Sequence, residues 1–155
     1  MSSLWLWLAA LATAALAALG FRRYLGLVIR VHSRSMLTTL RAGQLLFARP
    51  LRDTAQLRHG DIVVLHSAEL RERIIKRLIG LPGDTLVMDT QGLQRNGEQV
   101  IESYVAHPGG RAGHWQVPPG HYFVLGDNRV ASSDSRSWQA PYVQPDAIVG
   151  VARGK

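Results

Sequence analysis

The stretch RIIKRLIGLPGDTLV, residues 73–87, decides the fold class. It begins with the apolar run RIIKRLIG (residues 73–80), and a second run, TLVMD (85–89), follows after a Pro and a Gly. Both runs are short and apolar, which is typical of strands bounded by turns. The first run contains Lys76, and the only other Lys among the 18 Lys and Arg residues is the C-terminal Lys155. A buried Lys can lose its proton whereas an Arg cannot, so Lys76 is a candidate neutral amine.

The chain after residue 24 continues this pattern of short apolar runs divided by Gly, Pro and Asn. A hairpin is expected around Asn96-Gly97, the strongest short turn signal of the sequence, within LQRNGEQVI (93–101). Many short strands with turns between them predict a mainly β fold, a folded antiparallel β-sheet or barrel-like domain. The other expected strands are residues 25–31, 44–49, 61–66, 73–80, 85–89, 121–127 and 147–153.

An almost uninterrupted apolar run opens the chain. Residues 4–19 read LWLWLAALATAALAAL, with Thr13 as the only polar side chain, and Gly20 and Phe21 extend the run to 18 residues. As a helix it would be about 27 Å long at ~1.5 Å per residue, barely enough to span a hydrocarbon core of about 30 Å. Aromatic rings suit the two membrane interfaces, and they lie near both ends: Trp5 and Trp7, then Phe21 and Tyr24.

A cleavable signal peptide is the alternative interpretation of this run, because residues 15–17 form an A-x-A site. No Lys or Arg precedes the run, so the basic region of a signal peptide is missing and we expect an uncleaved, single-pass membrane anchor. We accordingly expect an anchor over residues 1–23 and a β domain over residues 24–155. Arg22 and Arg23 follow the apolar run, and the positive-inside rule alone would place the β domain in the cytoplasm.

Composition narrows the function classes. The net charge of +7 comes from scattered Arg residues, which suits anionic lipid headgroups, and no aromatic platform or nucleic-acid module accompanies it, so we expect no nucleic-acid partner. The chain has no Cys, which excludes disulfides, thiolate zinc sites and Cys nucleophiles. His107, His114 and His121 recur at seven-residue intervals among Gly and Pro, and we expect surface or loop His rather than a metal site.

A general base built on Lys76 needs an apolar environment that lowers its pKa, and it needs a hydroxyl to activate. Ser33 and Ser35 lie in VHSRSMLTTL (31–40), after an apolar strand, and their alternation places both side chains on one side. One could attack a carbonyl while the other donates a hydrogen bond to the developing oxyanion. Taken alone, this segment leaves ordinary loop hydroxyls as the alternative. The apolar neighbours of Lys76 are Ile74, Ile75, Leu78 and Ile79.

Three ordered motifs now amount to a resemblance. SRSMLTTL (33–40), RIIKRLIGLPGD (73–84) and GDNRVASSDSR (126–136) resemble the successive motifs of the type I signal peptidases. These are membrane-bound Ser–Lys endopeptidases that remove signal peptides from exported proteins. Weaker matches are GDIVVL (60–65) and IVGVA (148–152). The family fold, a mostly antiparallel folded β-sheet domain at the membrane surface, agrees with the strands expected here.

The resemblance implies a role for each matching position. Ser35 resembles the nucleophile and Lys76 the general base, and the Ser33 hydroxyl would form the oxyanion hole together with the backbone N–H of Ser35. Ser132 matches the hydroxyl that orients the Lys amine. The remaining matches are the supporting ion pair Asp134 and Arg136, the turn Gly126, Asp127 and Asn128, and the shallow apolar pockets of Val31, Met36, Leu40 and Ile75.

The resemblance also implies the reaction and the partners. An acyl-enzyme would form and be hydrolysed, with neither a metal nor an organic cofactor. Signal peptides of exported preproteins would bind as an extended strand, and membrane lipids would hold the enzyme at the extracytoplasmic face of the cell membrane. Two alternatives stay open: a related Ser–Lys maturation protease with a dedicated substrate, such as a pilin or conjugation protein, and a catalytically silent homologue. Thr38 stands where the family usually has Pro.

Overall fold

The structure is a computed structural model that describes residues 2–24, 26–106 and 109–152, without the side chains of Ser2 and residues 21–24. One α-helix, α1 (Ser2–Tyr24), precedes a β domain. The strands are β1 (Leu27–Arg30), β2 (Leu45–Pro50), β3 (Ile62–Ser67), β4 (Glu72–Gly80), β5 (Thr85–Asp89), β6 (Gly92–Arg95), β7 (Glu98–Gln99), β8 (Gly113–Gln116), β9 (Phe123–Leu125) and β10 (Ile148–Ala152). Short 3-10 turns are η1 (Thr54–Gln56), η2 (Arg129–Ala131) and η3 (Pro145–Ala147).

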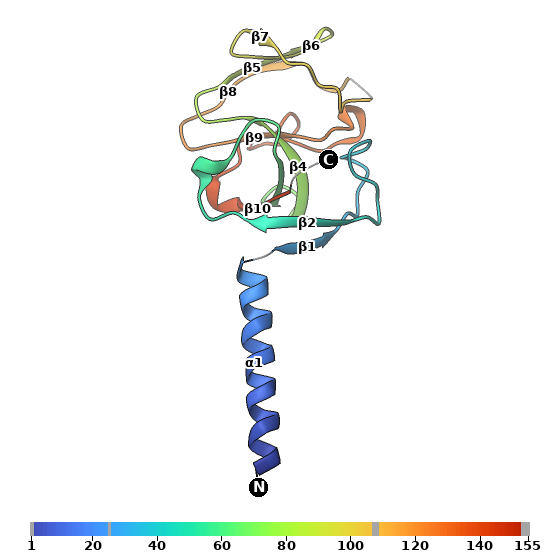
Figure 1. The fold of residues 1–155 in the computed structure, drawn as a ribbon. Helices are drawn as coiled ribbons and strands as arrows, with labels where there is room; N and C mark the ends of the chain where they lie inside the picture. The colour runs from blue at the N-terminus through green and yellow to red at the C-terminus, as the bar shows by residue number, and fades with distance from the viewer. Residues whose placement is uncertain (1, 25, 107–108, 153–155) are drawn as a thin grey trace.

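Helix α1 projects away from the β domain, with β1 and β2 at its upper end (Figure 1). Its segment Ser3–Gly20 is long and apolar enough to cross a membrane, and none of it is buried against the protein. The predicted N-terminal apolar helix is therefore present, and it is compatible with membrane anchoring. The interface roles expected for the side chains of residues 21–24, and the expected end of the last strand at Arg153, lie outside the described part of the chain.

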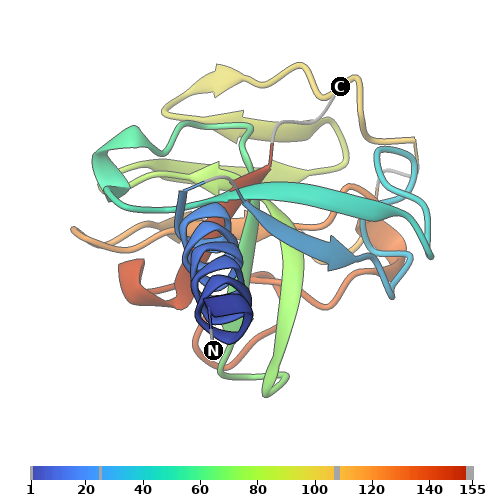
Figure 2. The ribbon, with the colours of Figure 1, turned by 60° about the horizontal axis from the view of Figure 1, so that its bottom comes forward.

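The strands form two antiparallel sheets. The larger sheet has the order β1-β2-β10-β3-β4-β9, and the smaller has the order β7-β6-β5-β8. The smaller sheet lies at the end of the domain remote from α1 (Figures 1 and 2). Each strand pair is antiparallel, which confirms the prediction of a mainly β, antiparallel fold.

Strand β8 is the element that the sequence did not predict. Its four residues begin with Gly and carry no apolar run, and they are a strand because they pair with β5. His114 therefore lies on a strand and not in a loop, although its side chain is exposed as expected. Strand β9 is also shorter than the expected run 121–127, because the chain turns away after Leu125.

Gly80 allows the two sheets to pack closely at the end of β4. A Cβ atom there would lie 2.8 to 2.9 Å from side-chain atoms of Val117, Leu86 and Phe123, which belong to one buried apolar cluster. The turn that follows needs Gly83 at a φ of +89°, a conformation that favours glycine. The stretch 73–87 thus ends one sheet and begins the other.

Candidate active site

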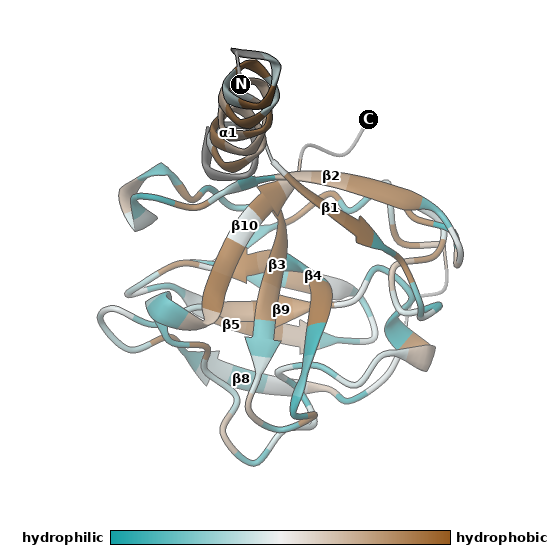
Figure 3. Cartoon of the chain, turned by 90° about the horizontal axis from the view of Figure 1, so that it is seen from below, coloured by the Kyte–Doolittle hydropathy of each residue, from teal (hydrophilic) through white to brown (hydrophobic). Residues whose placement is uncertain are grey.

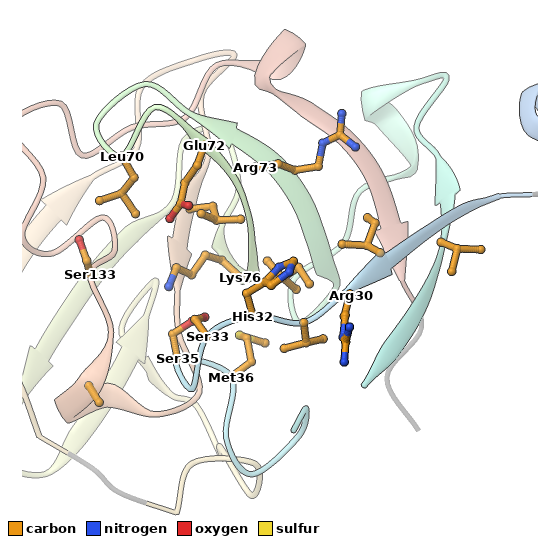
Figure 4. A pocket seen from close by; sticks show the side chains of 16 residues that line it. Arg30, His32, Ser33, Ser35, Met36, Leu70, Glu72, Arg73, Lys76 and Ser133 are labelled. Atoms are coloured by element: carbon orange, nitrogen blue, oxygen red, sulfur yellow. The ribbon is translucent and has the colours of Figure 1, made fainter. Parts of the chain in front are cut away.

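The end of β1 and the first half of β4 border a groove. Strand β9 pairs with β4 only from Arg77 onward, so among the described strands none covers the other edge of residues 72–76. The groove is lined by Val28–Val31, His32, Ser33, Ser35, Met36, Leu70, Glu72–Lys76, Ala131 and Ser133. Figure 4 shows the Lys76 amine inside this groove on the same side as Ser33 and Ser35.

The Lys76 amine lies beside the Ser132 hydroxyl, in the groove that also holds Ser33 and Ser35. Its Nζ donates a hydrogen bond to Ser132 Oγ at 3.0 Å, and the hydroxyls of Ser33 and Ser35 lie 3.1 Å apart. Ser35 and Lys76 are 5% and 3% exposed, whereas Ser33 is exposed. The hydrogen bonds of the described residues include none between Lys76 and Ser35, so in this structure the two groups share the groove without direct contact.

The environment of Lys76 favours the neutral amine. The pKa of Lys76 is lowered from 10.5 to about 8, mainly by burial and also by the nearby positive charge of Arg136. The negative charges of Asp134, Asp127 and Glu72 oppose this effect but do not cancel it. An amine with this pKa is partly neutral near physiological pH and can accept a proton from a hydroxyl.

Asp134 and Arg136 form a buried ion pair behind the Lys76 amine. The Arg136 Nε donates to Asp134 Oδ1 at 2.8 Å, and the two side chains are almost inaccessible to solvent. Burial alone would raise the pKa of the Asp134 carboxyl, but the hydrogen bonds and charge of Arg136 outweigh it and hold the pKa below its usual value. Asp134 also accepts from the backbone N–H of Gly126 at 3.0 Å, which ties the pair to the neighbouring turn.

The turn of Gly126, Asp127 and Asn128 contacts the segment that carries Ser35. The backbone N–H of Asn128 donates to the Ser35 carbonyl at 2.9 Å, and its side-chain amide donates to the Arg34 carbonyl. A Cβ atom on Gly126 would lie 2.2 Å from Ser132 Oγ and 2.6 Å from the Ser35 carbonyl oxygen. Only a glycine fits between these two groups.

Three of the four predicted pocket residues line the groove. Val31, Met36 and Ile75 form part of its apolar wall. Leu40 does not line it: its side chain is 3% exposed and packs in the same apolar cluster as the other three. The sequence placed Leu40 in the substrate pocket by resemblance alone, and in the structure it supports the wall from within the core.

The sequence missed a set of buried ionic side chains behind the groove. Arg77 forms an ion pair with Asp127 at 2.6 Å, and Thr39 also donates to that carboxylate. Arg129 forms a second buried ion pair with Glu102. Arg77 and Arg129 stand next to recognised motif residues, so their positions offered a signal. Glu102 lies between the expected strands and offered none.

Metal ligands are not grouped in the described part of the chain. No cluster of three or more His, Asp or Glu side chains that could hold an ion occurs there. His107 lies outside the described residues, and His121 hydrogen-bonds the Pro119 carbonyl at 3.0 Å. The groove lining offers hydroxyls, the Lys76 amine, the His32 imidazole and the Glu72 carboxylate.

Comparison with known sequences gives a consistent result. The family model described as signal peptidase, peptidase S26, matches residues 4–154. A signal peptidase I of Bacillus licheniformis is 38% identical over 148 residues, covering 88% of this chain and 80% of the relative. Signal peptidase I T of Bacillus subtilis (strain 168) is 35% identical over 159 residues, covering 95% and 82%.

A solved structure shows the same likeness. The crystal structure of a signal peptidase I from Enterococcus faecalis V583 matches with a TM-score of 0.56 and 32% sequence identity. The match covers 62% of this chain and 96% of that chain.

Proposed function

This chain belongs to the signal peptidase family S26, and from that premise we propose that Ser35 and Lys76 are the catalytic dyad of its groove. Its function is that of a type I signal peptidase, a serine endopeptidase that acts on signal peptides of preproteins. The observation that carries the dyad is the buried Lys76 amine, which donates to the Ser132 hydroxyl and has its pKa lowered to about 8. We take residues 1–23 as the anchor and residues 24–155 as the peptidase domain.

The reaction follows from the groups in the groove. Neutral Lys76 accepts the Ser35 proton as Oγ attacks the scissile carbonyl, and the resulting ammonium protonates the leaving amine. The Ser33 hydroxyl and the Ser35 N–H stabilise the oxyanion. A water activated by the same amine then hydrolyses the acyl-enzyme. Ser132 accepts one N–H of the amine, which orients the remaining electron pair toward the groove.

The substrate occupies the groove as an added strand. The uncovered edge of residues 72–76 supplies backbone groups for an extended peptide, and the segment after β1 and the middle of β4 bring Ser35 and Lys76 to its cleaved bond. Val31, Met36 and Ile75 form an apolar wall of the groove, against which small apolar side chains of the substrate would pack. Every relative named above is a signal peptidase I, which favours this substrate class over a dedicated maturation substrate.

Incubation of the detergent-solubilised protein with a preprotein tests this function. We expect one product, whose N-terminal sequence begins after a small residue at the signal-peptide junction. The Ser35→Ala variant should give no product while it keeps the unfolding temperature of the parent. Processing by Ser35→Ala at the parent rate would contradict the assigned nucleophile, and a product cut elsewhere would contradict the substrate class.

Membrane lipids are the second partner that we propose. Val28, Leu45 and Phe47 are 54%, 58% and 71% exposed, and the pairing of β1 with β2 places them on one face. That face lies beside α1, and β1 and β2 are largely apolar when viewed from the side of the helix (Figure 3). An apolar face next to a membrane helix is suited to rest on the bilayer surface, with the groove close to emerging substrates.

The absence of Cys makes this membrane contact easy to test. An environment-sensitive dye on Phe47→Cys in proteoliposomes should show blue-shifted emission and quenching by brominated lipids. The control is Ile101→Cys, because Ile101 is 90% exposed and follows β7 in the remote sheet. Equal quenching at both positions, or none at Phe47→Cys, would exclude a lipid-facing β1–β2 surface.

The orientation that we propose is N-terminus inside and peptidase domain outside the cell membrane. Processing of exported proteins needs this orientation, although the residues before Leu4 offer no charged side chain that would retain the N-terminus inside. Arg22 and Arg23 would then lie at the outer headgroups, against the bias of the positive-inside rule. Protease added to right-side-out vesicles should digest the domain; protection until permeabilisation would overturn the orientation.

A further inference from the structure

A segment outside the groove contacts the turn that holds the Ser35 carbonyl, and it also contacts Arg77, the ion-pair partner of that turn. This segment, residues 102–104, belongs to the loop between β7 and β8 and hence to the smaller sheet. The turn, residues 126–129, belongs to the larger sheet's side of the molecule and follows β9. Glu102 contacts the turn directly through Arg129, and Tyr104 contacts it indirectly, through Arg77.

The first contact is a buried ion pair. Glu102 accepts hydrogen bonds from both terminal nitrogens of Arg129, one of them at 2.8 Å, and the two side chains are 9% and 4% exposed. The Nε of the same guanidinium donates to the Gly126 carbonyl at 3.0 Å. Glu102 therefore fixes Arg129, and Arg129 holds Gly126, the first residue of the turn. A bidentate pair of this kind restricts orientation as well as distance.

The second contact reaches the middle of the turn. The Tyr104 ring lies 3.8 Å from the guanidinium carbon of Arg77, which forms a bidentate ion pair with Asp127. The Tyr104 hydroxyl donates to Glu102 at 2.8 Å, so the two contacts are coupled. Residues 102–104 thus hold the turn at two points through two different Arg side chains.

Movement of this turn would displace the groups proposed for catalysis. The Asn128 N–H binds the Ser35 carbonyl, and Gly126 packs against Ser132, the hydrogen-bond partner of the Lys76 amine. A displacement of about 1 Å in a reacting group can reduce a rate by about a hundredfold. The distance between the Ser35 hydroxyl and the amine therefore depends on how firmly the turn is held.

We propose that residues 102–104 clamp the turn 126–129, and that Glu102 is a positioning residue for peptide-bond cleavage that acts through Arg129. The inference rests on the proposed roles of Ser35 and Lys76. Glu102 does not line the groove, so substrate binding should not depend on it. The charges that act on the Lys76 amine are those of Asp134, Arg136, Asp127 and Glu72, so loss of Glu102 should leave the pH profile in place.

Glu102→Gln tests the clamp, since it keeps the side-chain length and removes the charge. The matched control is Glu98→Gln, which changes an exposed carboxylate on β7, just before the loop that carries Glu102. With a preprotein substrate and a temperature below unfolding, we expect kcat of Glu102→Gln to fall by about 10- to 100-fold. KM and the pH midpoint should stay at the values of the parent, and Glu98→Gln should behave as the parent throughout. A merely structural role would lower the unfolding temperature and leave kcat of the folded fraction unchanged.

The route through Arg129 has its own test. Adding Glu102→Gln to Arg129→Gln should cause no further loss of kcat, and full additivity would overturn that route. If Glu102→Gln does not fold, Tyr104→Phe decides, because it keeps the ring on Arg77 and removes only the hydroxyl bond to Glu102. A several-fold lower kcat supports the clamp.

Three outcomes would overturn the clamp. The first is a parent-like kcat in folded Glu102→Gln, or in Tyr104→Phe where that variant decides. The second is a change confined to KM, and the third is a shifted pH midpoint. The Ser35→Ala variant separates this failure from failure of the proposed function. If Ser35→Ala is inactive and folded Glu102→Gln is fully active, only the clamp is wrong.

Discussion

Lys76 and Arg77 are neighbours on β4, and they differ in charge: the Lys76 amine can be neutral, whereas the Arg77 guanidinium stays charged. Successive side chains of a strand point to opposite faces, so these neighbours enter different environments. Both are buried, at 3% and 8% exposure. Lys76 meets the Ser132 hydroxyl and has no carboxylate among its hydrogen-bond partners in the described structure. Arg77 forms a bidentate pair with Asp127 under the Tyr104 ring.

The difference shows how one strand serves two purposes. A carboxylate in contact with Lys76 would hold the amine in its charged form, and hydroxyl partners leave it free to lose the proton. On the other face a permanent charge is an advantage, because a bidentate ion pair fixes the position of the turn that carries Asp127. Asp134, the anion with the largest effect on the Lys76 pKa, is paired with Arg136, whose positive charge opposes that effect.

Replacing Lys76 by Arg, and Arg77 by Lys, tests this comparison directly, and the first replacement should have the largest effect on kcat/KM. Lys76→Arg keeps the positive charge and removes the ability to be neutral, so we expect kcat/KM to fall by about a thousandfold or more, within the range of a lost general base. Arg77→Lys keeps a charge on the supporting face and loses only the fork geometry, so a loss of at most about tenfold is expected. Steady-state cleavage of a preprotein measures both.

Two controls make the exchange decisive. Both variants should keep the secondary structure of the parent, measured by circular dichroism, because each retains a buried cation. Near-normal turnover by Lys76→Arg would refute the general-base role. A larger loss in Arg77→Lys than in Lys76→Arg would show that the catalytic and supporting faces have been assigned the wrong way round.

Gly126→Ala should have the next largest effect, because it disturbs the junction of the two faces. The added Cβ would lie 2.2 Å from Ser132 Oγ and 2.6 Å from the Ser35 carbonyl, so one of the two must move. We expect about a hundredfold loss of kcat, the scale of a 1 Å displacement. Gly20→Ala is the control, since no atom lies within 4 Å of its added Cβ. Full activity of Gly126→Ala would mean that the turn does not position Ser132.

Local sequence patterns predicted most of the fold. The hairpin at Asn96-Gly97 is present as the turn between β6 and β7, with φ values of +54° and +83° that suit Asn and Gly. The strand over residues 73–80 extends by one residue in the structure, where it is β4. Strand β8 could not be predicted, because pairing with a distant strand, and not local composition, makes its four residues extended.

The candidate site likewise contains residues that the sequence indicated and residues that it did not. A lone internal Lys in an Arg-rich chain and an alternating Ser pair made Lys76 and Ser35 candidates, and the family resemblance gave them their expected roles. The structure brings the two residues into one groove. Glu102 and Tyr104 were not identifiable, since they contact Arg129 and Arg77, which are more than 20 positions away in the chain. Leu40 was placed in the pocket by resemblance, which cannot distinguish a wall residue from the core behind it.

The pH profile sharpens the comparison, because only the catalytic face should titrate. With the pKa of Lys76 at about 8, kcat/KM should fall about tenfold per pH unit below that value and level off above it. Asp134, with a lowered pKa, stays ionised throughout, and the raised pKa of Tyr104 keeps its phenol neutral. A rate profile measured between about pH 5 and pH 9 that is flat would contradict a titrating amine.

The smallest expected effect concerns stability. The folded-state pKa of Lys76, about 8, is below the unfolded value of 10.5, so the unfolded state binds more protons between these values. The penalty is complete below about pH 8 and disappears as the pH rises through 10.5. Each pH unit corresponds to about 1.4 kcal/mol, which gives a penalty on the order of 3 kcal/mol.

Lys76→Met should therefore be inactive and yet more stable than the parent at neutral pH. We expect its free energy of unfolding to be higher by about 2–3 kcal/mol near pH 7, with a difference that shrinks as the pH approaches the unfolded-state value. Denaturant unfolding in detergent at several pH values measures this difference. Arg73→Met, which removes an exposed cation from the same strand, should give a difference that does not vary with pH over this range, because Arg stays charged. An equal gain for Lys76→Met at neutral and alkaline pH would assign the stabilisation to apolar packing and not to the buried amine. The catalytic face of β4 would then carry no cost in stability, and the contrast with the ion-paired face would be one of geometry alone.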